Sequence, residues 1–99
     1  MKKPEECRSL EDVRGAIDQI DREVIASLAR RAEYVRVAGS FKKTEHGVRA
    51  PARVETMLAQ RRTWAEEDGL DPAFVEALYR QVVDYFVRQE LATWKRGGQ

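Results

Sequence analysis

The segment Ser9–Lys42 carries one helical hydrophobic period from end to end. Its apolar residues recur every three or four positions, or at twice that spacing: Leu10, Val13, Ile17, Ile20, Val24, Leu28, Val35, Ala38 and Phe41. This spacing places them on one face of an α-helix. At about 1.5 Å per residue the helix spans roughly 50 Å, about three times the length of an average globular helix. The rest of the chain is too short to cover this face, so we expect a second long helix to do so, most simply that of a second copy.

Two shorter helices are expected after a loop. The segment 43–50 breaks the helical period and contains Gly47, which predicts a loop. Pro51 suits the first turn of a helix that ends near Gly69, where glycine can take the left-handed conformation beyond a helix C-terminus. The predicted inner face of this helix is Val54, Met57, Leu58, Arg61 and Trp64.

The capping residues complete an all-α prediction. Ser9 is expected to cap the long helix, with Asp12 three residues on, and Asp71 is expected to cap a third helix. The inner face of that third helix is predicted to be Val75, Leu78, Val82, Phe86 and Glu90. The tail Lys95–Gln99 contains two glycines and is expected to fray. We therefore predict one all-α domain over residues 1–99, with one long helix, two shorter helices and no strand.

Composition excludes several classes of protein. Eighteen Lys and Arg against 17 Asp and Glu give a net charge of +1, which argues against a nucleic-acid-binding protein. Cys7 is the single cysteine, so no intrachain disulfide is possible and no cysteine-based metal site is indicated. The first residues show no signal peptide, and no run approaches the ~18–20 apolar residues of a membrane span. We expect a soluble, cytoplasmic protein without a membrane partner.

Two cations lie on the apolar face of the long helix, which we call its seam. The seam continues through Leu28, Arg31, Val35, Ala38 and Lys42, with no carboxylate in that stretch. Burying a charge is costly unless an anionic partner compensates it. One interpretation is that Arg31 reaches out to water and that Lys42 interacts with the helix dipole. The other is that Arg31 and Lys42, whose Cα atoms would lie ~16 Å apart along the axis, converge on one small anion.

Other charged residues bear on this candidate site. Arg14 lies roughly 25 Å from Arg31 along a straight helix, so both could reach one small molecule only if an antiparallel partner helix supplied one of them. Glu90 is a carboxyl on an apolar stripe, and either a salt bridge to an arginine or a role in the anion site accounts for it. His46 is expected to be a solvated loop residue. No nucleophile triad, phosphate-binding loop or metal-ligand spacing is recognised, so an enzyme of this kind should need neither nucleophile nor metal.

Several blocks of the sequence carry a family resemblance. They are Pro4–Cys7, Ile17–Asp21, Leu28–Val35, Phe41–Lys42, Ala50–Val54, Trp64–Asp71 and Phe74–Glu76. With them the chain resembles, over residues 1–94, the all-helical chorismate mutase superfamily. The spacing of Arg14, Arg31 and Lys42 is typical of that superfamily. The blocks of the second and third helices are similar to those of the isochorismate pyruvate lyases of siderophore pathways that make salicylate, such as the pyochelin pathway.

The resemblance implies an intertwined homodimer with two active sites, each built from both chains. Arg14 of one subunit and Arg31 of the other would bind the two carboxylates of a dianionic substrate, with a further contact from Arg53 near the mouth. Lys42 would donate to the ether oxygen as its bond to the ring breaks. The segment 43–50 would close over the site as a lid. The expected reaction turns isochorismate into salicylate and pyruvate in a cofactor-free pericyclic step.

Glu90 stands where the lyases of this family usually carry a glutamine that donates to the same ether oxygen. We therefore expect Glu90 to act in its protonated form, which can donate. A local shift that puts Gln89 in that place is the alternative. It is disfavoured because a shift of one residue turns a side chain about 100° around the helix.

Two other functions stay open at this point. Chorismate mutase activity, which makes prephenate, would use the same scaffold. Dedicated mutases of this fold commonly carry a carboxylate just after the arginine at the start of the second helix, whereas Val54 follows Arg53 here. A non-catalytic dimerisation module would carry apolar residues in place of Arg31 and Lys42. Both observations favour the lyase.

Overall fold

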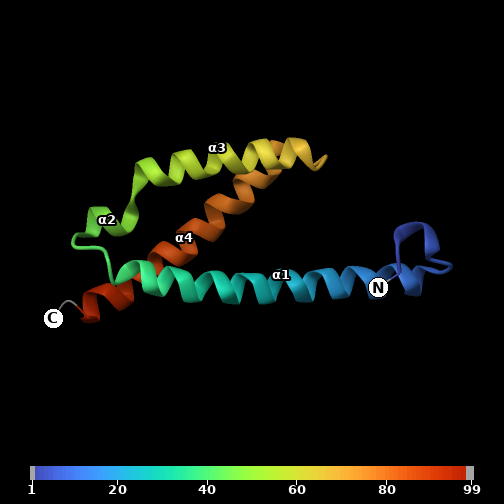
Figure 1. Ribbon diagram of the computed structural model, residues 1–99, viewed down its shortest axis with the longest axis horizontal. Coiled ribbons are helices and arrows are strands. Elements are labelled where there is room, and N and C mark those ends of the chain that lie inside the picture. The colour runs from blue at the N-terminus through green and yellow to red at the C-terminus, as the bar shows by residue number, and fades with distance from the viewer. Residues whose placement is uncertain (1, 98–99) are drawn as a thin grey trace. The chain divides into compact units, whose positions relative to one another are not determined.

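The computed structural model describes residues 2–97, and the regular structure in that range is entirely helical (Figure 1). A 3₁₀ turn, η1 (Pro4–Glu6), precedes four α-helices: α1 (Leu10–Gly39), α2 (Glu45–Arg49), α3 (Pro51–Glu67) and α4 (Pro72–Gly97). The prediction of an all-α chain with three main helices is confirmed, and α1 is the longest at 30 residues. Within the described residues, no helix is both long and apolar enough to cross a membrane.

The start of α1 is capped as the sequence predicts. Ser9 Oγ accepts a hydrogen bond from the Asp12 N–H at 3.1 Å. The Asp12 carboxylate in turn accepts from the Arg8 N–H at 2.9 Å and pairs with Lys2 at 3.1 Å. The Arg8 N–H and the Lys2 ammonium hold the pKa of the Asp12 carboxyl below its ordinary value of 3.8. Ser9 Oγ thus satisfies one orphan N–H of the first turn, and the Asp12 carboxylate ties the preceding segment to the start of the helix.

The end of α1 corrects the predicted boundary at Lys42. The helix stops at Gly39, and the N–H groups of Ser40, Phe41 and Lys42 each donate to the carbonyl three residues back, at 3.0 to 3.2 Å. Ser40 Oγ also donates to the Val37 carbonyl at 2.6 Å. This tighter turn replaces the α-helical pattern. The 3.6-residue period therefore does not extend to Lys42, and the seam register that placed Lys42 in line with Arg31 does not hold.

The segment predicted as a loop contains the short helix α2, which is a second correction. Thr44 caps α2, since its Oγ1 accepts from the Gly47 N–H at 2.9 Å, and Val48 is buried at 3% exposure. Ala50 ends α2 in the left-handed conformation, with φ of 40°. The following Pro51 disfavours a right-handed helical conformation at Ala50, which explains why the chain turns there. The Thr44 cap and the burial of Val48 thus stabilise a helix here, although Gly47 had predicted a loop.

The turn between α3 and α4 follows the predicted capping residues. Gly69 has a positive φ of 78°, and its N–H donates to the Glu66 carbonyl at 3.2 Å. The Leu70 N–H donates to the Ala65 carbonyl at 2.8 Å, which completes a Schellman motif. Asp71 Oδ1 then accepts from the Ala73 N–H at 3.0 Å and starts α4.

The helices α3 and α4 pack against each other, and α2 contacts α4 (Figure 1). The buried apolar side chains are Val48, Met57, Leu58, Ala65, Val75, Phe86 and Leu91. Trp64 and Leu78 were assigned to inner faces by the sequence, but both are exposed at 45% and 46%. The two helices pack over narrower stripes than the periodicity implies.

At its C-terminal end α4 continues to Gly97, so the predicted fraying does not begin at Lys95, while residues 98 and 99 lie outside the described part of the chain.

The apolar stripe of α1 is exposed in the single chain. The side chains from Leu10 to Leu28 on this stripe keep between 36% and 61% of their surface exposed. The chain divides into two compact units, one ending at Tyr34 and one beginning at Val35, and most of the stripe belongs to the first. A face of this kind is expected to be covered by another molecule.

Ion pairs join the exposed edges of α3 and α4. Glu76 lies 2.8 Å from Arg62 and 3.0 Å from Arg80, which also reaches Glu55 at 3.5 Å. The guanidinium of Arg62, followed by that of Arg80, holds the pKa of Glu76 below its ordinary value of 4.5. The charged form of Glu76 is therefore the one that stabilises this helix pair.

Glu76→Gln should lower the melting temperature at pH 7 by a few degrees at most, because exposed ion pairs contribute little. Since the folded pKa is depressed, this contribution is present above the ordinary pKa of 4.5 and is lost as pH falls through the folded value. Thermal unfolding at one protein concentration, from pH 7 to pH 3, checks this. Glu55→Gln is the matched control, since Glu55 pairs with Arg80 but is 67% exposed, and should change less. An equal loss for Glu76→Gln at both ends of the pH range would contradict the assignment.

Candidate active site

Lys42 and Glu90 form an ion pair between the turn after α1 and the C-terminal half of α4. Lys42 Nζ lies 3.1 Å from Glu90 Oε2, with the Lys42 side chain 27% exposed and that of Glu90 8% exposed. The sequence left open a salt bridge between Glu90 and an arginine. The salt bridge exists, and its partner is Lys42. The carboxylate missing from the seam of α1 is thus supplied by another helix.

Gly39 gives Glu90 the room to approach. A Cβ added at Gly39 would lie 3.3 Å from Glu90 Cγ and 3.6 Å from Oε2. A side chain at the last position of α1 would therefore require Glu90 to shift. A Cβ added at Gly47 of α2 would likewise lie 3.9 Å from Cβ and Cδ of Lys42. Two glycines therefore border the two partners of the ion pair.

The main chain of Lys42 is held as well. Its N–H donates to the Gly39 carbonyl at 3.2 Å, and its carbonyl accepts from the indole Nε1–H of Trp94 at 3.3 Å. Three separate contacts, at the N–H, the carbonyl and the ammonium, fix one residue that lies outside any regular helix. The result is a cation that is positioned by the fold but still reaches solvent, as an electrostatic group of an active site must.

The remaining predicted site residues are distributed over both units. Arg14 is exposed on α1, and Arg31 is partly buried farther along the same helix, both in the unit that ends at Tyr34. Arg53 is exposed in the first turn of α3, in the same unit as Lys42 and Glu90. Of the five residues, the structure brings together Lys42 and Glu90. His46 is exposed on α2, as expected for a solvated residue.

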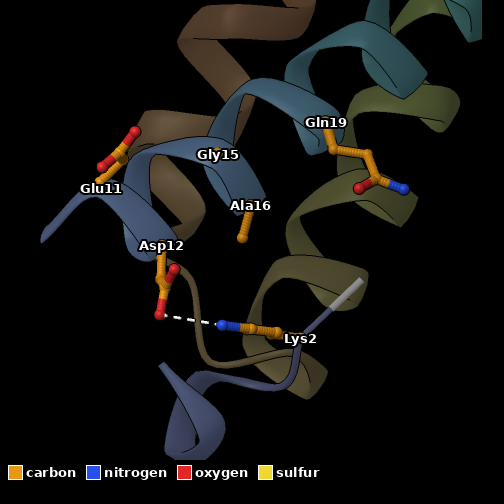
Figure 2. Close-up of a pocket in the computed structure, with 6 residues that line it drawn as sticks. All are labelled: Lys2, Glu11, Asp12, Gly15, Ala16 and Gln19. Carbon is orange, nitrogen blue, oxygen red and sulfur yellow. Dashed lines mark hydrogen bonds and ion pairs between the residues drawn. The ribbon is translucent and has the colours of Figure 1, made fainter. Parts of the chain in front are cut away.

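A hollow of about 350 Å³ lies elsewhere, beside the first turns of α1 (Figure 2). Its lining residues are Lys2, Glu11, Asp12, Gly15, Ala16 and Gln19. Figure 2 shows the Lys2 ammonium pointing to Asp12, with which it pairs. None of the predicted substrate-binding residues lines this hollow. Its mixed charge, with two carboxylates beside one lysine, does not suit a dianion.

The sequence missed two residues of the Lys42 environment. Gly39 was expected inside a continuing helix, and Trp94 was not singled out at all. A possible signal for Trp94 was its place four residues after Glu90, on the same face of α4. The contact between Trp94 and Lys42 spans 52 positions, and helical periodicity carries no information about such pairs.

The sequence of the chain also matches a known protein family. The chain matches the chorismate mutase type II family over residues 13–91, and it belongs to that family. The superfamily resemblance found in the sequence is thereby confirmed.

Individual relatives narrow the comparison. The isochorismate pyruvate lyase of Pseudomonas aeruginosa is 44% identical over 96 residues, which cover 97% of this chain and 95% of that protein. The T-protein of Haemophilus influenzae is 36% identical over 92 residues, or 91% of this chain and 23% of that protein. The T-protein of Enterobacter agglomerans is 36% identical over 73 residues, or 72% of this chain and 19% of that protein. The chain thus matches nearly the whole lyase but a short part of each T-protein.

Proposed function

We propose that this protein is an isochorismate pyruvate lyase, which converts isochorismate to salicylate and pyruvate. The observation that carries the proposal is 44% identity to a lyase of that name over almost the full length of both chains. In the proposed reaction, the bond between the ring and the ether oxygen breaks. The hydrogen on the ring carbon that bears the hydroxyl moves to the methylene of the enolpyruvyl group. The ring becomes aromatic, and the released arm becomes pyruvate, so atoms and electrons balance without a cofactor.

Lys42 is the group proposed to act on the breaking bond. Negative charge grows on the ether oxygen as that bond lengthens, and a cation already in place stabilises it without reorganisation. The backbone contacts of Lys42 support this role, because they hold its N–H and its carbonyl while part of the side chain stays exposed. Orientation of the enolpyruvyl arm over the ring supplies the rest of the rate enhancement.

Arg14, Arg31 and Arg53 are proposed to bind the substrate carboxylates. A guanidinium suits this role because it can bind a carboxylate through two parallel hydrogen bonds. In the proposed homodimer, Arg14 of one subunit lies beside Arg31 of the other, so that each site is shared. The exposed apolar stripe of α1 supports the dimer, since a second long helix would cover it. A charged, soluble chain of this composition suits the cytoplasm.

The direct test is to add isochorismate to the purified protein and follow salicylate by its fluorescence. The second candidate is chorismate mutase, which the family match favours. Chorismate should be turned over more slowly than isochorismate, because Val54 stands where dedicated mutases commonly carry a carboxylate. Formation of prephenate from chorismate at a higher kcat/KM than that of salicylate from isochorismate would reverse the assignment.

The protein should be an obligate homodimer without a stable folded monomer. The reason is the amount of apolar surface that α1 leaves exposed in a single chain. Sedimentation at micromolar concentration should show dimer alone, and a folded monomer there would overturn this.

Mixing refolded Arg14→Ala and Arg31→Ala chains should restore part of the activity, because one of the two sites in a mixed dimer keeps both arginines. No recovery on mixing would place both arginines of a site in one chain.

Arg31→Ala and Lys42→Ala should lose activity by different routes. Lys42→Ala should lower kcat by roughly 10²–10³-fold, as loss of a group that stabilises transition-state charge does. Arg31→Ala should act mainly on KM, raising it roughly 10²-fold through the lost carboxylate contact. Steady-state kinetics of both variants checks the difference. An unchanged kcat for Lys42→Ala, with only KM altered, would show that Lys42 does not act on the breaking bond.

Glu90 should make the enzyme more active at low pH. An ionised Glu90 neutralises Lys42 and repels the substrate, whereas a protonated Glu90 can donate a hydrogen bond to the ether oxygen. The charged group that faces it is Lys42, and Gly39 closes its other side. We expect kcat/KM to fall as the pH is raised from about 5 to about 8, and Glu90→Gln to flatten the profile. Glu76→Gln, outside the site, is the control and should keep the slope. A flat profile for the parent protein, unchanged in Glu90→Gln, would show that Glu90 is not the donor.

A further inference from the structure

Trp94 lies near the C-terminal end of α4 and donates its indole N–H to the carbonyl of Lys42 at 3.3 Å. The side chain is partly buried, so this hydrogen bond is shielded from competing water. It lies beyond the residues that match the chorismate mutase type II family, which end at 91. One partner of this contact thus lies inside the matched range and the other lies outside it.

The carbonyl of Lys42 is a sensitive point for the direction of its side chain. Lys42 follows the end of α1 and precedes the Thr44 cap of α2, so no helical hydrogen bond accounts for its carbonyl. Rotation of the peptide plane that contains this carbonyl changes the backbone dihedral at Lys42. A change there alters which rotamers of the long Lys42 side chain are allowed, and so where its ammonium can reach. A donor that fixes the carbonyl therefore also fixes where the charge can reach.

Glu90 and Trp94 act on Lys42 from the same helix face. They are four residues apart on α4, which places their side chains one above the other. Glu90 holds the ammonium at 3.1 Å, and Trp94 holds the carbonyl at 3.3 Å. When substrate binds and the ammonium turns toward the ether oxygen, the Glu90 contact is shared or lost. The Trp94 contact does not involve the ammonium, so it can persist through the reaction.

We propose that Trp94 is a positioning residue for Lys42, whose indole N–H keeps the lysine ammonium aimed at the breaking bond. This inference rests on the proposed function, since it takes Lys42 as the group that stabilises the ether oxygen. Trp94 itself does not touch substrate. Its contribution should appear in kcat, because a misdirected ammonium binds substrate in the ground state nearly as well but stabilises the transition state less.

The test compares Trp94→Phe with Trp64→Phe. Phenylalanine keeps an apolar ring at position 94 and removes the N–H donor. Trp64 is the other tryptophan, on α3, where its ring stacks on the Arg61 guanidinium at 4.7 Å, and a phenyl ring can keep that stacking. Trp94→Phe should lower kcat for isochorismate roughly 3- to 10-fold, the effect of one lost hydrogen bond, with KM changed less than about twofold. Trp64→Phe should leave both constants within about twofold of the parent.

The melting temperatures of both variants are measured in the same buffer, to separate positioning from folding. An unchanged kcat in Trp94→Phe, or an equal fall in kcat in both variants, would overturn the proposal. A fall confined to KM would also overturn it. An activity-independent readout is the exchange of the two indole N–H protons with solvent, followed by NMR. The Trp94 proton should exchange more slowly than that of Trp64, and equal fast exchange would show that the hydrogen bond is not made.

These readouts keep the proposal distinct from the proposed function. If the parent protein makes no salicylate from isochorismate, the proposed function fails, while the exchange rates still decide whether Trp94 holds Lys42. If the parent is active and Trp94→Phe behaves like Trp64→Phe, the lyase assignment stands and the role of Trp94 is wrong.

Discussion

The ion pair between Lys42 and Glu90 is the interaction on which the local structure of the site depends. A carboxylate as buried as Glu90 loses most of its hydration, and it is tolerated only if a nearby cation compensates the charge. Lys42 provides that cation at 3.1 Å because α1 ends early, at Gly39, and the chain turns toward α4. The same glycine leaves space for the carboxylate. The early end of α1, the small size of Gly39 and the buried Glu90 carboxylate therefore depend on one another.

The pair also shapes the chemistry of the proposed reaction. A cation that is already neutralised offers little to a substrate, so Lys42 must be at least partly released when the ether oxygen becomes negative. In the proposed reaction, a protonated Glu90 would meet that need and add a donor of its own, which would make the interaction stronger in the transition state than in the ground state.

The starts of α1, α3 and α4 and the end of α3 could be predicted from the sequence, because capping is a local interaction. Ser9, Gly69 and Asp71 each use hydrogen bonds to residues within five positions, and each stands where the sequence placed it. The predicted end of the first helix at Lys42 was wrong for an equally local reason: the helix stops at Gly39, where Ser40 donates to the Val37 carbonyl although the apolar period continues.

The contacts of the site itself were harder to predict. Lys42 and Glu90 were both singled out as charges on apolar stripes, yet their pairing spans 48 positions and joins the turn after α1 to α4. The hydrogen bond from Trp94 has the same character. Periodicity identifies which residues are unusual on one helix, and it does not identify their partners on another. Periodicity also does not fix which apolar residues are buried. Leu78 lies on an apolar stripe and is still exposed, because that stripe can face away from the chain's own core.

In the proposed reaction, the Lys42–Glu90 pair acts by its charge and hydrogen bonding, and not by transferring protons to or from carbon. The most direct test uses isochorismate with deuterium on the ring carbon that bears the hydroxyl, converted in ordinary water and analysed by NMR of the pyruvate methyl group. A pericyclic transfer guided by a fixed cation predicts that the methyl group retains the deuterium of the substrate. A methyl group that carries hydrogen from the solvent instead would contradict the account, because a protein group would then have removed one proton and delivered another.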